Sequence, residues 1–89
     1  MKNEFFDLLI KNRIDTLCDA ALREINTDPI KNNDIKFSTK RAILNVRRDG
    51  IEYINDLLNS DHINNLRYND LKVKIDHYIK NTIDLIEKL

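Results

Sequence analysis

The chain of 89 residues contains one glycine, one proline, one cysteine and no tryptophan. A single glycine excludes the glycine-rich phosphate loops of nucleotide-binding enzymes, which need several glycines close together. A single cysteine excludes an internal disulfide and the zinc motifs built on paired cysteines. We therefore expect no metal and no cofactor. An unpaired thiol is typical of a reducing environment, so we expect a cytoplasmic protein, in the cytoplasm of the host cell if the chain is viral.

Net charge and long apolar runs are also absent. The chain has 15 basic and 15 acidic side chains, which give a formal net charge of zero. No stretch approaches the roughly 18 apolar residues of a membrane span, and charged residues interrupt the first twenty, so no signal peptide is predicted. A neutral chain lacks the broad basic surface of nucleic-acid-binding proteins. We expect no membrane contact, and direct nucleic-acid binding is the least favoured of the functions considered.

The side chains capable of catalysis are few. His62 and His77 are far apart in sequence, and neither belongs to a cluster spaced for metal binding. Cys18 lies beside the apolar stripe of the first predicted helix, where a packed structural thiol is more common than a nucleophile. The sequence therefore predicts that the protein is not an enzyme.

Apolar residues recur with a 3.6-residue period in three segments, and no segment alternates like a strand. The predicted helices cover residues 3–25, 38–59 and 70–89, with Pro29 ending the first helix and Ser38 capping the second. Residues 61–68 form either a short fourth helix or an extension of the third. The predicted core stripes are Phe6, Ile10, Ile14, Leu17, Ala21 and Ile25; Ile43, Val46, Gly50, Ile54 and Leu57; and Leu71, Ile75, Tyr78, Thr82, Ile86 and Leu89.

Short connections between helices favour antiparallel neighbours. The sequence therefore predicts a single all-α domain over residues 1–89. We expect a small antiparallel three-helix bundle, in which a helical hairpin is joined by a C-terminal helix. In the alternative, a long hairpin completes its core only by oligomerisation.

A basic segment, "KFSTKRAILNVRRDG" at residues 36–50, interrupts the even charge distribution. On a helix its four central cations, Lys40, Arg41, Arg47 and Arg48, fall in an arc of about 120°. In a helix that begins at Ser38, two of them would occupy the first turn, where positive charge is unfavourable and backbone N–H groups can bind an anion. This pattern predicts an anion contact. The alternative is that the cations are solvated or pair with acids of neighbouring helices.

The same predicted helix carries a second apolar stripe at Leu44, Ile51 and Leu58. It is therefore apolar over about half of its circumference, as expected for the central helix of a bundle or for a helix buried in an oligomer. Gly50 costs about 1 kcal/mol relative to alanine in a helix. Its presence predicts that a backbone or a ligand approaches closely at this position, or that the helix is locally broken there.

These features predict a non-enzymatic protein that binds and blocks or bridges another macromolecule. The bias towards Asn, Ile and Lys fits a low-GC genome, and thus a viral antagonist of a host system or a bacterial immunity or antitoxin-like protein. The expected partners are a protein with an acidic surface and further copies of the chain. The predicted contact residues are Lys36, Ser38, Lys40, Arg41, Leu44, Arg47, Arg48 and Ile51.

The alternative function is an oligomeric module that holds an anionic small molecule. The ligand would be a nucleotide or cyclic nucleotide bound at the N-terminus of the second helix. Ser38, Lys40 and Arg41 would contact its phosphates, through side chains and through the backbone N–H groups of the first turn.

Overall fold

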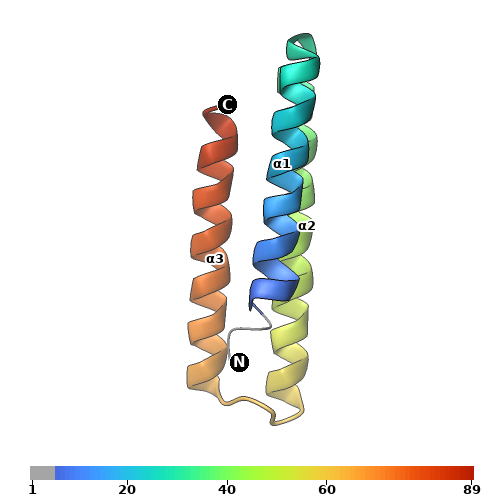
Figure 1. The fold of residues 1–89 in the computed structure, drawn as a ribbon. Coiled ribbons are helices and arrows are strands. Elements are labelled where there is room, and N and C mark those ends of the chain that lie inside the picture. The colour runs from blue at the N-terminus through green and yellow to red at the C-terminus, as the bar shows by residue number, and fades with distance from the viewer. Residues whose placement is uncertain (1–5) are drawn as a thin grey trace.

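The protein folds into three helices that run up, down and up (Figure 1). The computed structural model describes residues 6–89, and side chains from residue 8 onward, so the predicted helix start at residues 3–5 and the Phe6 side chain lie outside the described part. The residues described include no strand, and the predicted antiparallel three-helix bundle is confirmed. The elements are the π-helical turn η1 (Phe6–Lys11), α1 (Asn12–Thr27), the 3₁₀ turn η2 (Pro29–Lys31), α2 (Asn32–Asn59) and α3 (Asn65–Glu87).

The central helix is α2, which packs against both α1 and α3. Its 28 residues span about 42 Å, most of the longest dimension of a molecule that measures 49 × 19 × 16 Å. Figure 1 shows the hairpin of α1 and α2 extending beyond the last turn of α3. Because α2 contacts two helices on different sides, its apolar surface is wider than that of a peripheral helix.

The core consists largely of isoleucine, with contributions from η1 and all three helices. Each fully buried side chain of this size stabilises the fold by about 1.5–3 kcal/mol relative to an exposed one. The largest fully buried side chains are Ile10, Ile14, Ile43, Val46, Ile54, Ile75 and Ile86. The predicted stripes are thus mainly right, with corrections in all three helices: Leu17, Ile25, Leu57 and Tyr78 are only partly buried and Leu89 is exposed, whereas the flanking Ile79 is buried.

Helix α2 begins at Asn32, so the predicted start at Ser38 is wrong. The chain passes through the 3₁₀ turn that starts at Pro29 directly into α2, and proline favours such a position at a helix start. The Asn/Asp-rich residues 32–34, which lie between the helices predicted from the sequence, belong to the first turn of α2. The missed signal is Ile35, which is buried and extends the core stripe two turns before Ile43.

Helix α3 begins at Asn65, five residues before the predicted start. The Asn64 side chain caps it by accepting a hydrogen bond of 2.8 Å from the backbone N–H of Arg67. Residues 65–69 therefore extend the third helix and do not form a separate one. The turn before them contains Asp61 in the left-handed region, with φ of 63°, a conformation that aspartate tolerates better than most residues.

Gly50 lies in the interior of α2, and the helix continues through it without a break. Its position is buried, and a Cβ atom added there would lie 2.5 Å from the Cδ1 atom of Ile10. The group that approaches Gly50 closely is thus the Ile10 side chain from η1. Glycine allows η1 to pack directly on the backbone of α2.

Candidate functional site

The structure divides the predicted contact residues between two sides of α2. Lys40 and Arg47 face α3, where the Lys40 Nζ atom lies 3.3 Å from Glu87 Oε2 and the Arg47 Nε donates to Asp76 Oδ1 at 2.6 Å. Lys36 donates to the backbone oxygen of Glu87 at 3.2 Å. These three cations therefore join α2 to α3. The two part-exposed ion pairs, those of Lys40 and Arg47, each contribute about 1 kcal/mol or less.

The predicted anion site at the start of the second helix is not formed. Ser38, Lys40 and Arg41 lie six or more residues inside α2. In a helix interior each backbone N–H donates to the carbonyl four residues earlier, so these groups cannot cradle a phosphate. Ser38 instead lines a groove between α1 and α2.

Two cations remain on the outward side of α2, together with two apolar side chains. Phe37 is 60% exposed and Leu44 is 48% exposed, and the guanidinium carbon of Arg41 lies 5.8 Å from the centroid of the Phe37 ring. Such a distance allows a cation–π interaction. The exposed Arg48 has an Nη2 atom 3.5 Å from Asp49 Oδ1. We call this surface the α2 face: Phe37, Arg41, Leu44 and Arg48.

Sequence reasoning missed Phe37, although it precedes Leu44 by seven residues and so belongs to the stripe of Leu44, Ile51 and Leu58. Ile51 was predicted at the contact, but it is partly buried and packs against the core. Ile30, seven residues before Phe37, is 96% exposed. The exposed apolar side chains of this stripe therefore belong to the N-terminal half of α2 and the turn before it.

The chemistry of the α2 face is that of an apolar centre flanked by guanidinium groups. Phe37 and Leu44 are about 10.5 Å apart along the helix, as are Arg41 and Arg48. Guanidinium groups bind carboxylates through paired hydrogen bonds and stack on flat side chains. Aromatic residues and arginine are also the types enriched where proteins bind one another.

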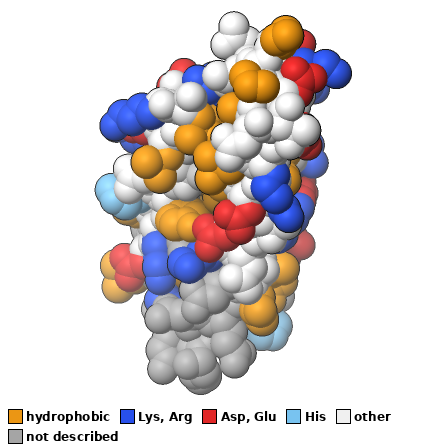
Figure 2. All heavy atoms as spheres, turned by 45° about the horizontal axis from the view of Figure 1, so that its top comes forward, with side chains coloured by type: hydrophobic (Ala, Val, Ile, Leu, Met, Phe, Trp, Pro, Cys, Tyr) orange, Lys and Arg blue, Asp and Glu red, His pale blue; other side chains and the backbone are white. Residues whose placement is uncertain are grey.

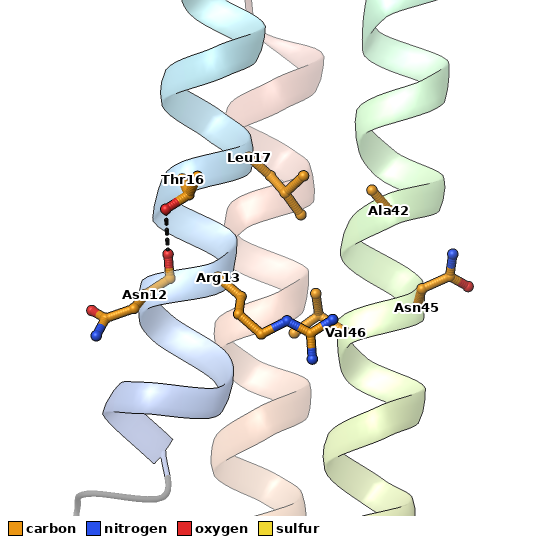
Figure 3. Close-up of a pocket in the computed structure, with 7 residues that line it drawn as sticks. All are labelled: Asn12, Arg13, Thr16, Leu17, Ala42, Asn45 and Val46. Carbon is orange, nitrogen blue, oxygen red and sulfur yellow. Dashed lines mark hydrogen bonds between the residues drawn. The ribbon is translucent and has the colours of Figure 1, made fainter.

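A second candidate is the groove between α1 and α2, with a volume of about 500 Å³. Figure 3 shows its seven lining residues, with the Arg13 side chain extending from α1 towards α2. Arg13 pairs with Asp49 at 3.3 Å, and the Thr16 hydroxyl donates to the backbone oxygen of Asn12 at 2.9 Å. The lining residues include no histidine, cysteine or carboxylate, and the one hydroxyl group among them, that of Thr16, is hydrogen-bonded to the backbone of α1.

The thiol of Cys18 is partly buried against the core. Burial, and then the negative charges of Asp15 and Asp19, raise the pKa of Cys18 above its ordinary value. The thiol therefore stays protonated at neutral pH, whereas the thiolate is the nucleophilic form. This environment supports a structural role for Cys18.

Both histidines lie on the surface. His62 Nδ1 is 2.7 Å from the Oγ atom of Ser60, a contact that sequence spacing did not indicate. The Ser60 Oγ atom is also within hydrogen-bond distance of the backbone oxygens of Asp56 and Leu57, at 2.8 and 3.3 Å, so Ser60 interacts with the last turn of α2. Among residues 6–89 no cluster of His, Cys, Asp and Glu is suited to a metal ion, and no helix there has the length and apolarity of a membrane span.

The seam between α1 and α3 carries another exposed apolar surface. The Tyr78 hydroxyl donates to Asp15 Oδ1 at 2.8 Å and so sets the register of these two parallel helices. Leu22 and Leu85, each seven residues further along, are both exposed. Figure 2 shows hydrophobic side chains along the line between α1 and α3.

The Tyr78 hydroxyl is expected to lose its proton at a higher pH than the hydroxyl of an exposed tyrosine. Burial and the hydrogen bond to Asp15 raise the pKa of Tyr78 to about 12, above the value of about 10 for an unfolded chain. The neutral phenol is therefore favoured by the fold, and its contribution to stability is complete below pH 10 and lost as the pH rises to 12. An absorbance titration near 295 nm should show one tyrosine component with a midpoint near pH 12. Tyr78→Phe should abolish that component, and a titration unchanged by this substitution would contradict the expectation.

Comparison of the chain with protein-family models, curated proteins and solved structures finds no match. The interpretation of the site therefore depends on its own geometry.

Proposed function

We propose that this is a non-enzymatic binding protein that contacts another protein through the α2 face. The observation that supports the proposal is the division of the α2 cations. Three are paired with α3, whereas Arg41 and Arg48 stand exposed beside Phe37 and Leu44. Aromatic side chains and arginine are enriched in protein interfaces relative to the rest of the surface. The partner surface should present carboxylates around an apolar patch.

The nucleotide-binding alternative has no comparable support, because the N–H groups on which it depended lie inside α2. Nucleic acid is also a poor fit, since two exposed arginines would neutralise few phosphates and leave the binding weak at physiological salt. Blocking, bridging, viral antagonism and immunity or antitoxin-like roles remain predictions, because the identity of the partner decides between them.

The proposal is tested by charge reversal on the α2 face. Arg41→Glu/Arg48→Glu should reduce capture of the partner from an extract of the source cells at least tenfold, because it places acids opposite acids. Lys72→Glu/Lys80→Glu changes the net charge equally on the exposed surface of α3 and should leave capture unchanged. A photo-crosslinking residue at Leu44 should attach to the captured protein, whereas one at the exposed Val73 of α3 should not. Equal capture by both charge variants would refute the proposal.

A further inference from the structure

Residues 36–48 and 49–61, called here the cationic and acidic halves of α2, carry opposite charge, and Asp34 in the first turn of the helix precedes both. Residues 36–48 include five cations and no acid, and residues 49–61 include four acids and no cation. All of these except Asp61 lie within α2 itself. Asp56 stands in the last turn, where the helix dipole disfavours a negative charge. Helix stability therefore does not account for this order of charges.

The apolar stripe of α2, which is exposed at Phe37 and Leu44 and partly buried at Ile51 and Leu58, has its own centre. Phe37, Leu44, Ile51 and Leu58 follow one another at seven-residue intervals, and so lie along one side of the helix. The midpoint of this stripe falls between residues 47 and 48, and the charge boundary falls between residues 48 and 49. The two patterns thus share a centre to within one residue, about 1.5 Å along the helix.

We propose that a second copy of this chain binds antiparallel across the α2 face, with a two-fold axis near residue 48. The inference rests on the proposed function of the α2 face as a protein-binding surface, and it names one partner. In this arrangement Leu44 of each copy lies opposite Ile51 of the other, and Phe37 lies opposite Leu58. An interface of this kind is isologous, so every contact occurs twice.

Charge complementarity supports the antiparallel direction. A two-fold axis perpendicular to the helices brings the same flank of both α2 copies together. Arg41 and Glu52 are both exposed, and steps of 100° per residue place them on the same flank of the stripe. Arg41 of one copy therefore lies level with the interval between Glu52 and Asp56 of the other. Lys40 and Arg47, on the opposite flank, keep their own α3 partners.

The second copy fits the α2 face because the chain supplies the acidic surface that this face requires. The cationic half of each α2 meets the acidic half of its neighbour, whereas a parallel pairing would place like charges side by side. The seven-residue spacing of the apolar side chains also favours another helix as the partner, because two helices with this repeat can pack their apolar stripes against one another along their length.

The experiment uses two single variants of the full chain and their mixture. Sedimentation equilibrium of the wild type should approach twice the monomer mass of 10.6 kDa as concentration rises. Arg41→Glu and Glu52→Arg each place like charges at both symmetric contacts, so each alone should dimerise at least tenfold more weakly. An equimolar mixture should recover the dimer, because both contacts then join opposite charges. Asp84→Arg, on the exposed side of α3, is the control and should leave the dimer intact.

Two results would overturn the inference: a wild-type chain that stays monomeric at all concentrations, or a mixture that remains monomeric while both variants keep their helical circular dichroism. Neither result would affect the crosslinking test at Leu44, so failure of the dimer is distinguishable from failure of the proposed function. Glu52→Arg keeps Arg41 and Arg48, and with self-association weakened it should still capture a separate acidic partner.

Discussion

Ser38→Pro is expected to lower the free energy of unfolding by about 3 kcal/mol or more. Ser38 is the seventh residue of α2, so its N–H donates to the carbonyl of Asp34 in the regular helix pattern. Proline removes this donor, and its ring collides with the preceding turn. For a small domain with a total stability of about 5–15 kcal/mol, the loss is a large fraction of the whole.

The matched control is Ser38→Ala, measured in the same urea titration followed by circular dichroism at 222 nm. If Ser38 were the N-cap, alanine would cost about 1 kcal/mol. At an exposed interior position alanine should be neutral or slightly stabilising, because it is the better helix former. A tolerated proline together with a costly alanine would show that the helix begins at Ser38.

Gly50→Ala is expected to destabilise the protein by about 1 kcal/mol, although alanine alone would favour the helix by a similar amount. The added methyl group would meet Ile10 Cδ1 at 2.5 Å in a fully buried site, and overpacking of this kind costs about 1–3 kcal/mol. Ile10→Val deletes the obstructing atom. In that background Gly50→Ala should instead stabilise the fold by about 1 kcal/mol, an interaction energy of about 2 kcal/mol between the two sites.

Ile14→Val provides the control for this cycle. Ile14 is as fully buried as Ile10, but it is not among the nearest atoms to a Cβ at Gly50. Chemical denaturation should therefore show Gly50→Ala to be destabilising in the Ile14→Val background, as it is in the wild type. The same effect of Gly50→Ala in both valine backgrounds would mean that contact with Ile10 does not explain the glycine.

The helix type and the main core stripes could be predicted because helical periodicity is a local property of the chain. Ile43 and Ile54 recur on one side of α2 and Ile75 falls on the apolar stripe of α3 whatever surrounds these helices, and all three are fully buried. The helix boundaries were less predictable. Asn and Asp both interrupt helices and begin them, so residues 32–34 alone do not say which role they play. The burial of Ile35 decides it, and burial depends on the other helices.

The sequence by itself determined the angular position of each cation on α2, the seven-residue stripe and the charge boundary at residue 48, because angle and height on a helix follow from residue number. Only the tertiary structure decided which cations are available for binding. Lys40 and Arg47 share an arc with Arg41 and Arg48 in the sequence, yet α3 lies against one edge of that arc and supplies Glu87 and Asp76 to the first pair. Arg41 and Arg48 lie on the part of the arc that α3 does not cover. The position of α3 depends on how the three helices pack together, and no local pattern along α2 contains that information.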